Sequence, residues 1–137
     1  MHKDLALVFF YKGNKILMQD RRNISKLGEE WGFFGGRIEA GETPEEAVVR
    51  EVKEELDYKL VDFTFIKKSH HSFADWTFTV YAFTAPCPSL DSFDQKEGQG
   101  MKLASEKEAM KLKLNKPDYD IIKYVFEFLR AGKNKLR

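Results

Sequence analysis

The sequence predicts an α/β fold, a mixed β-sheet sandwiched between α-helices. Two long stretches rich in aromatic and β-branched residues, 5–22 and 59–85, each have the form of a β-hairpin. A capped helix is expected between them at 44–56, and an amphipathic helix at 117–132. Because strands and helices are interleaved in this order, we expect a single domain over residues 1–132.

The composition suits one domain of ordinary charge. The 137 residues are 42% hydrophobic and 14% aromatic, which is enough to bury a sizeable core. The formal charge of +1 provides no basic surface for a long nucleic acid. No apolar run approaches the roughly 20 residues that span a bilayer, and the single Cys87 forms no internal disulfide. We therefore expect a cytoplasmic protein with no membrane partner, and a homodimer is compatible with the sequence.

The first hairpin consists of strands at 5–11 and 15–22. Residues 12–14 (Lys-Gly-Asn) have the turn chemistry that joins two antiparallel strands. Residues 23–30 are polar and rich in turn formers, which predicts a surface loop. That loop leads to a short strand that ends in "FFGG".

The helix at 44–56 has a complete N-terminal signal. The Thr43 hydroxyl can cap it, Pro44 suits its first position, and Glu46 completes a capping box. One edge of the helix is apolar and faces the core; it consists of Val48, Val52 and Leu56. The edge beside it is acidic and consists of Glu51, Glu54 and Glu55.

The second half of the chain repeats the pattern of hairpin and helix. Strands are expected at 59–73 and 75–85, and a long polar loop over 89–100 is expected to be functional or mobile rather than a plain connector. A short strand follows at 101–103, and residues 105–112 suit one or two helical turns. The last helix should begin at Pro117 and be stopped by Gly132, so that the basic tail, residues 133–137, frays.

The acidic edge belongs to a longer motif. The stretch from Gly36 onward resembles the signature of the Nudix hydrolase family, MutT-like pyrophosphohydrolases, which runs G-x5-E-x7-R-E-U-x-E-E-x-G-U with U aliphatic. Seven positions are in register: Gly36, Glu42, Arg50, Glu51, Val52, Glu54 and Glu55. The chain departs from the signature at its end, where Asp57 and Tyr58 replace the glycine and the aliphatic residue. Because Asp tolerates a left-handed conformation, the helix cap can survive this change.

Three like charges on one helix face destabilise a helix unless cations lie among them. A solvated face paired with Arg50 and Lys53 is the alternative for an isolated acidic run. The full register instead favours a metal site, because Mg²⁺ and Mn²⁺ bind carboxylate oxygens together with substrate phosphates. The resemblance implies that the Gly35 carbonyl, Glu51, Glu54 and Glu55 hold the metal, and that one of the carboxylates activates water.

The resemblance also assigns supporting roles around the metal. It implies that Arg50 orients the carboxylates and that Glu42 fixes the loop before the helix. Glu97 lies where relatives place a further acidic ligand, although a solvated loop charge is equally compatible with its position; Asp91 and Asp94 are weaker candidates.

The substrate contacts are less well defined by the sequence. Arg21 and Arg22 can reach phosphates or can be exposed strand-end charges, and Gly36 and Arg37 are further candidates. Asp118 can read a nucleobase edge, yet Asp in a helix's first turn is also favoured by the helix dipole. Asn115, Tyr119 and Asp120 are alternatives for the same role, and the aromatic residues Trp31, Phe34, Phe73 and Trp76 can stack on a base or belong to the core.

The resemblance predicts a pyrophosphohydrolase that needs Mg²⁺ or Mn²⁺ and acts on a small nucleotide. A nucleoside triphosphate, including oxidised purine forms, is the expected substrate. Sugar-linked and dinucleotide compounds are alternatives. A non-catalytic nucleotide sensor is a rival from another class, but a sensor does not need three carboxylates that prepare water.

Overall fold

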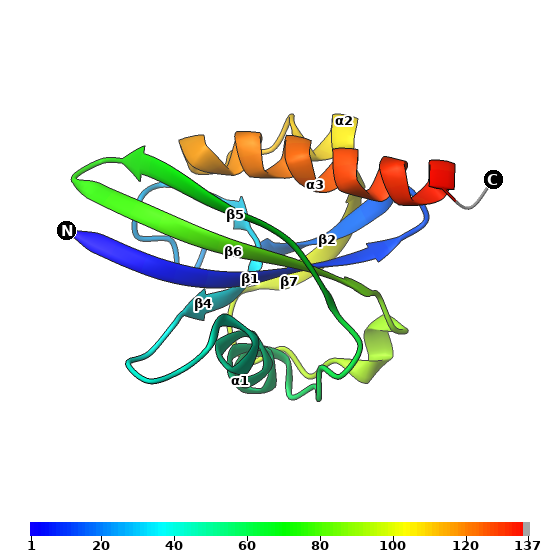
Figure 1. The fold of residues 1–137 in the computed structure, drawn as a ribbon, viewed down its shortest axis with the longest axis horizontal. Coiled ribbons are helices and arrows are strands. Elements are labelled where there is room, and N and C mark those ends of the chain that lie inside the picture. Colours follow the sequence, from blue (N-terminus) through cyan, green and yellow to red (C-terminus); the bar gives the residue numbers. More distant parts are fainter. Residues whose placement is uncertain (136–137) are drawn as a thin grey trace.

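The computed structural model describes the backbone of residues 1–135 and the side chains of residues 1–132. Figure 1 shows three layers: α1 lies below a central sheet, and α2 and α3 lie above it. The strands are β1 (His2–Lys12), β2 (Lys15–Asp20), β3 (Trp31–Gly32), β4 (Phe34–Arg37), β5 (Thr64–Phe73), β6 (Trp76–Pro86) and β7 (Gly100–Ser105). The helices are α1 (Pro44–Leu56), α2 (Glu106–Ala109) and α3 (Lys116–Lys135), with a 3-10 turn η1 (Leu90–Ser92). The predicted mixed sheet between helices is confirmed.

Strand β1 organises the sheet because it changes partners along its length. Its first half pairs antiparallel with β4, from Leu5 opposite Arg37 to Val8 opposite Phe34. Its last residues pair with β2, and its other edge runs parallel to β6. This change of partner places β4, and with it the "GG" segment, beside the middle of the sheet.

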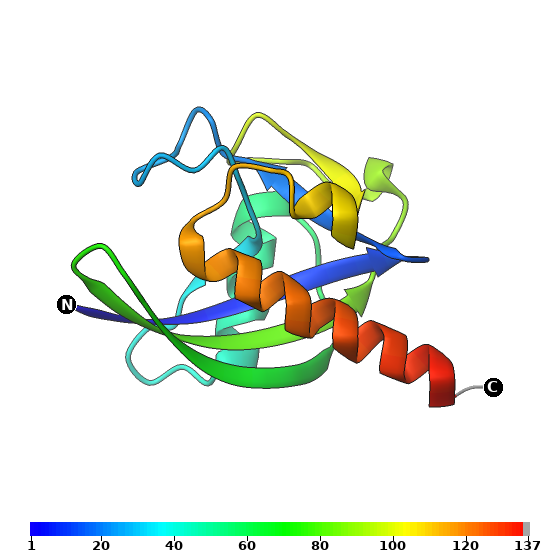
Figure 2. The same ribbon diagram turned by 90° about the horizontal axis from the view of Figure 1, so that it is seen from above.

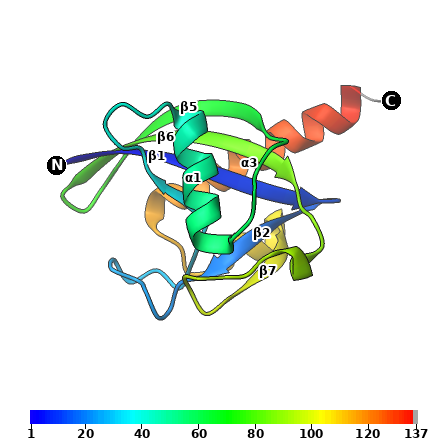
Figure 3. The same ribbon diagram turned by 90° about the horizontal axis from the view of Figure 1, so that it is seen from below.

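The sheet separates two apolar cores. Alternate residues of β1 point to opposite faces, so that Phe9 packs with α3 and Phe10 packs with α1. Ile121 and Ile122 of α3 are fully or almost fully buried in the first core. Figure 3 shows α1 crossing the lower face of the sheet, where Val52 is completely buried.

Helix α1 matches its prediction at both ends. The Thr43 hydroxyl accepts the Glu46 N–H at 3.1 Å, and the Glu46 carboxylate accepts the Thr43 N–H at 2.9 Å. Asp57 ends the helix with a φ of 48°, and its N–H donates to the Lys53 carbonyl. Asp57 therefore supplies the left-handed cap that the family signature assigns to glycine.

Two predicted boundaries are wrong. Helix α3 runs through Gly132 to Lys135, because a glycine that does not adopt a left-handed conformation only weakens a helix and does not end it. The part of the predicted frayed tail at 133–135 is therefore helical, and residues 136–137 lie outside the described residues. The second hairpin begins at Thr64 and not at Lys59, since the chain first turns away from the end of α1. No helix in the described part of the chain is long and apolar enough to cross a membrane.

Candidate active site

The candidate active site is centred where β4 passes α1. The Gly35 N–H donates to Glu55 Oε1 at 2.9 Å, and Gly36 lies directly against the carboxylate of Glu51. A Cβ on Gly36 would lie 2.5 Å from Glu51 Cδ, and a Cβ on Gly35, whose φ is +130°, would collide with the Ala6 carbonyl. Gly35 thus requires glycine for its close approach to the backbone of β1, and Gly36 allows the Glu51 carboxylate to lie against the backbone of β4.

Arg50 joins the acidic groups of the motif. Its guanidinium bonds both oxygens of Glu42, at 2.6 and 2.9 Å, and donates to the Arg37 carbonyl at 2.9 Å. The same group reaches Glu51 at 2.9 Å and Glu54 at 3.3 Å. Hydrogen bonds from Arg50 lower the pKa of Glu42 to about 2. The arrangement of these contacts matches the predicted supporting positions of Arg50 and Glu42.

The two inner carboxylates are poorly hydrated. Glu55 is 3% exposed, and burial raises its pKa to about 8, with a smaller contribution from the nearby charges of Glu51 and Glu97. Burial likewise raises the pKa of Glu51, in opposition to its hydrogen bond with Arg50. Glu54 differs from both, since its side chain is 58% exposed. The site therefore concentrates negative charge that neighbouring protein groups neutralise only in part.

The loop that carries Glu97 packs on the end of α1. The Lys96 N–H donates to the Glu55 carbonyl at 2.6 Å, and the Asp94 N–H donates to the Leu56 carbonyl at 2.8 Å. Glu97 is exposed, and its charge acts on both Glu51 and Glu55. Asp91 lies on η1, and Asp94 pairs with Lys96 at 2.7 Å. Among the acids of this loop, Glu97 is therefore the one whose charge affects both Glu51 and Glu55.

A cleft opens on the other side of Gly35 and Gly36. It has a volume of about 200 Å³, and an apolar cavity of about 70 Å³ adjoins it under the first turn of α3. The cleft and the cavity share four lining residues: Leu5, Leu7, Asn115 and Asp118. Arg21, Glu29 and Phe33 line only the cleft, and His71, Phe73 and Phe78 line only the cavity. The cleft beside the two glycines thus lies next to an apolar recess.

Charged side chains line the cleft. Glu29 is 6% exposed and accepts bonds from Arg21 Nε at 3.0 Å and Ser25 Oγ at 2.7 Å. Burial and, to a smaller extent, the charge of Glu29 raise the pKa of Asp118 to about 7, against the opposing effect of Arg21. Figure 2 shows the start of α3 beside the loop between β2 and β3 that carries Glu29. The Asp118 carboxyl, which keeps its proton to a higher pH than an ordinary Asp, therefore borders the cleft.

The other predicted substrate residues lie in varied positions. Arg22 bonds the Asp20 carboxylate and lines neither the cleft nor the cavity described above. The Arg37 side chain is exposed, and its carbonyl is held by Arg50. Phe34 is fully buried in the α1 core, so that it cannot stack on a base. Of the four candidate aromatic residues, Phe73 alone lines the cavity.

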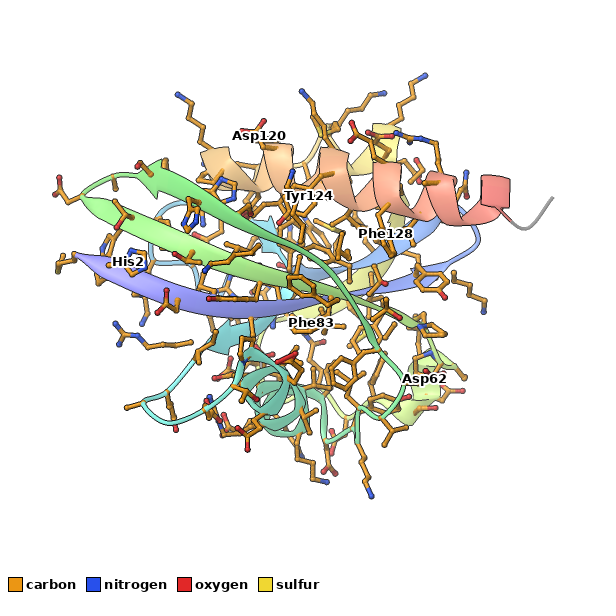
Figure 4. The ribbon with its side chains drawn as sticks, in the orientation of Figure 1. His2, Asp62, Phe83, Asp120, Tyr124 and Phe128 are labelled. Carbon is orange, nitrogen blue, oxygen red and sulfur yellow. The ribbon has the colours of Figure 1, made fainter. Side chains whose placement is uncertain are left out.

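Neighbours of Asp118 on α3 divide between core and solvent. The Tyr119 hydroxyl donates to the Leu112 carbonyl at 2.7 Å, which engages it in the fold. Figure 4 shows Asp120 on the outer side of α3, where it is exposed. Tyr124, also labelled in Figure 4, pairs with Ser69 of β5 at 2.9 Å. Asp118 and Asn115 are thus the residues of this segment that face the cleft.

Glu29 was not predicted to be a functional residue, because its segment is polar and reads as a surface loop. The one signal in the sequence is the combination of Ser25 and Gly28, whose groups fold the loop back onto the carboxylate: Ser25 Oγ donates to Glu29 and accepts the Gly28 N–H. Such contacts depend on the loop conformation and have no fixed spacing.

The oxygen atoms of the site are not arranged as a complete metal coordination shell. Among residues 1–132, no group of three or more His, Cys, Asp or Glu side chains is arranged to hold an ion. The Arg50 guanidinium instead donates hydrogen bonds to the carboxylates of Glu51 and Glu54. The donor set still suits a hard divalent cation, since it offers carboxylates and a backbone carbonyl and contains no sulfur or imidazole.

Comparisons with known proteins agree with this geometry. A family model described as NUDIX domain matches residues 1–125. An 8-oxo-dGTP diphosphatase of Proteus vulgaris is 35% identical over 72 residues, which cover 53% of this chain and 64%, less than two thirds, of that relative. A CTP pyrophosphohydrolase of Escherichia coli K12 is 25% identical over 130 residues, 95% of each chain. The solution structure of the E. coli ORF135 protein has a TM-score of 0.77 at 23% identity and covers 96% of this chain and 92% of that one, a likeness of fold.

Proposed function

The chain belongs to the NUDIX domain family, and we propose on that premise that it is a metal-dependent hydrolase of the diphosphate linkage in a nucleoside diphosphate derivative. A single observation carries the proposal: the cleft lined by the glycines beside Glu51 and Glu55 adjoins an apolar recess, and Asp118 lines both. A nucleotide has a matching form, because a charged phosphate chain is attached to a flat base. Water would attack a phosphorus atom, and a triphosphate would yield a nucleoside monophosphate and pyrophosphate.

The site residues fit Mg²⁺ or Mn²⁺ by their chemistry. Gly35 through its carbonyl would hold the ion together with Glu51, Glu54, Glu55 and Glu97. When bound, the ion would neutralise phosphate oxygens and lower the pKa of a water molecule. The pKa values of Glu51 and Glu55 are raised mainly by burial and to a smaller extent by neighbouring acids, and a bound cation would relieve both effects, which supports this assignment.

The protein's own groups would orient the carboxylates and accept the proton of the attacking water. Arg50 holds Glu51 and Glu54 by their oxygens, and Glu42 holds Arg50 in turn, so that the carboxylates are oriented before substrate enters. One carboxylate among Glu51, Glu54 and Glu55 would accept the proton of the attacking water. Gly36 leaves room for the Glu51 carboxylate, which a side chain at this position would displace.

The recess favours a nucleoside triphosphate as the substrate. Leu5, Leu7 and Phe78 provide apolar walls for a base, and Asp118 and Asn115 provide polar groups at its edge. The printed activities of the relatives, on 8-oxo-dGTP and on CTP, support oxidised purine and pyrimidine triphosphates as the first candidates. Arg21 lines the cleft and is the proposed phosphate contact. Arg22 pairs with Asp20 and does not line the cleft, so its position gives less support to a phosphate contact.

A nucleotide panel tests the proposal. Purified protein is incubated with 8-oxo-dGTP, the common nucleoside triphosphates, sugar nucleotides and dinucleotides, in Mg²⁺ or Mn²⁺, and the products are separated by chromatography. We expect metal-dependent release of a nucleoside monophosphate, stopped by EDTA. Absence of turnover with either metal would contradict the hydrolase function and favour a nucleotide sensor, which direct binding measurements on the same panel would detect.

A further inference from the structure

Gln19 is completely buried at the end of β2, and both ends of its side-chain amide are engaged. Its Nε2 donates to the Glu97 carbonyl at 3.3 Å, and its Oε1 accepts a bond from Arg21 Nη1 at 2.8 Å. A buried amide is costly unless its donor and acceptor are satisfied, so these two contacts define its position. One side chain therefore connects the loop of Glu97 to the arginine that lines the cleft.

The loop from 94 to 99 packs closely on β2 at this point. The Gln99 N–H donates to the Asp20 carbonyl at 3.0 Å. Gly98 has a φ of +86°, and a Cβ there would lie 2.6 Å from the same carbonyl. The Gln95 amide also donates to the Glu97 carbonyl, at 2.7 Å. The Glu97 carbonyl is thus held from two sides, by Gln19 of the sheet and by Gln95 of the loop.

The Glu97 carboxylate, in contrast, has no hydrogen bond to any other group in the part of the chain whose side chains are described. Its side chain is exposed, so that the backbone of the loop sets the region that the acid can reach. The preceding residue, Lys96, donates its N–H to the Glu55 carbonyl at 2.6 Å, which holds this backbone beside the end of α1. The position of the acid relative to the site therefore depends on the groups that fix the loop backbone.

We propose that Gln19 is a positioning residue that holds the Glu97 carbonyl against β2 and thereby presents the Glu97 carboxylate to the site on α1. Its second bond links that position to Arg21 in the nucleotide cleft. The inference rests on the proposed function for its catalytic consequence, since Glu97 belongs there to the metal-binding set. The hold on the loop is a property of the protein alone, and it can be measured without substrate.

Gln19→Glu isolates the contact, because it keeps the size of the side chain and an oxygen for Arg21 but replaces the donor to the Glu97 carbonyl with an acceptor. Gln19→Met, which lacks both groups, is the second variant in case the buried carboxylate prevents folding. Gln99→Glu is the matched control: it makes the same chemical change in the same loop, at an exposed side chain. The loop is followed by amide hydrogen exchange of Lys96 and Gln99 in metal-free protein.

We expect exchange at these two amides to accelerate by about tenfold in Gln19→Glu, as loss of one hydrogen bond allows, while amides of α1 and the Gln99→Glu control stay near wild type. Turnover of CTP and 8-oxo-dGTP with Mg²⁺ should show a lower kcat with KM within about twofold. In a Glu97→Gln background, Gln19→Glu should have little further effect, since the two changes act through one group.

Unchanged exchange at Lys96 and Gln99 would overturn the proposal, and so would an equal loss of kcat with and without the Glu97 carboxylate. A wild-type protein that turns over no nucleotide would contradict the proposed function alone. The exchange rates would in that case still decide whether Gln19 holds the loop, so the two failures are distinguishable.

Discussion

The Gly35 N–H donates a 2.9 Å hydrogen bond to Glu55 Oε1, and these residues are 20 positions apart in the chain. The bond joins β4 to the last turn of α1. It orients the most buried carboxylate of the acidic edge against the backbone of β4. A short strand and a capped helix, each formed locally, are thereby joined into one site.

The two glycines should respond differently to alanine. Gly35→Ala places a Cβ against the backbone of Ala6, at a φ that alanine rarely adopts, so we expect the free energy of unfolding to fall by roughly 3 kcal/mol. Gly36→Ala meets only the flexible end of Glu51 and should cost about 1 kcal/mol or less while lowering kcat. Urea unfolding and steady-state kinetics measure both, and a Gly35→Ala protein of wild-type stability would contradict this interpretation of the β4 backbone.

Glu97→Gln should lower turnover and leave stability unchanged. The carboxylate is exposed, so its loss should alter the free energy of unfolding of metal-free protein by less than about 0.5 kcal/mol. We expect kcat to fall by about tenfold or more if the acid helps to hold a catalytic metal. Asp91→Asn, another exposed acid of the same segment, is the control. Wild-type turnover of the Glu97 variant would show that this residue is only a solvated charge on the loop.

Asp118 should make stability depend on pH. The unfolded chain loses this proton near pH 3.8, whereas the folded protein keeps it until about 7, because burial and Glu29 outweigh Arg21. The folded state therefore binds more protons between these values, and stability falls as the pH rises from about 4 to 7. Asp118→Asn removes this dependence. Since the group borders an open cleft, solvent screens part of the effect.

We expect Asp118→Asn to exceed wild type in free energy of unfolding by roughly 1 kcal/mol at pH 8, with the difference shrinking towards pH 4. Asp120→Asn, on the exposed side of the same helix, is the matched control and should show no such trend. Denaturant titrations at four pH values test this prediction. A difference that is equal at pH 4 and pH 8 would show that the Asp118 proton is not retained by the folded state.

Asp118→Ala should alter base selection. A side chain that reads a base edge changes the ratio of kcat/KM between purine and pyrimidine triphosphates by about tenfold when it is removed, equivalent to about 1.4 kcal/mol. The measurement compares 8-oxo-dGTP, dGTP and CTP, with Asp120→Ala as control. An unchanged ratio with a small loss of thermal stability would make Asp118 a helix-terminus residue with no role in recognition.

Local signals were sufficient to predict part of this molecule. The capping box at Thr43 and the periodicity of α1 predicted that helix within its observed bounds, because its end groups are satisfied by residues of the same segment. The hairpin turn at Gly13 was predicted for the same reason. Gly132, in contrast, predicted an end of α3, but the helix continues to Lys135 because this glycine does not adopt a left-handed conformation.

Contacts between distant segments could not be predicted in this way. Gln19 meets the loop of Glu97 across 78 positions, and Glu29 is buried by a loop that has no periodic pattern. Pairing of Arg50 with the acidic face was foreseen as an alternative to a metal site, and Arg50 does pair with Glu54 at 3.3 Å. The carboxylate motif was therefore visible in the sequence, whereas the contact of Gln19 with the loop of Glu97 was not.

Glu54→Gln tests the central claim, that the acids of α1 perform metal-dependent hydrolysis. The Glu54 side chain is 58% exposed and its bond to Arg50 is a surface pair, so metal-free stability should change by less than about 0.5 kcal/mol. With Mg²⁺ and the best substrate of the panel, we predict that Glu54→Gln loses at least about 99% of wild-type kcat, since a ligand and a charge are removed together. Turnover within a few-fold of wild type, by a variant of unchanged stability, would contradict the account.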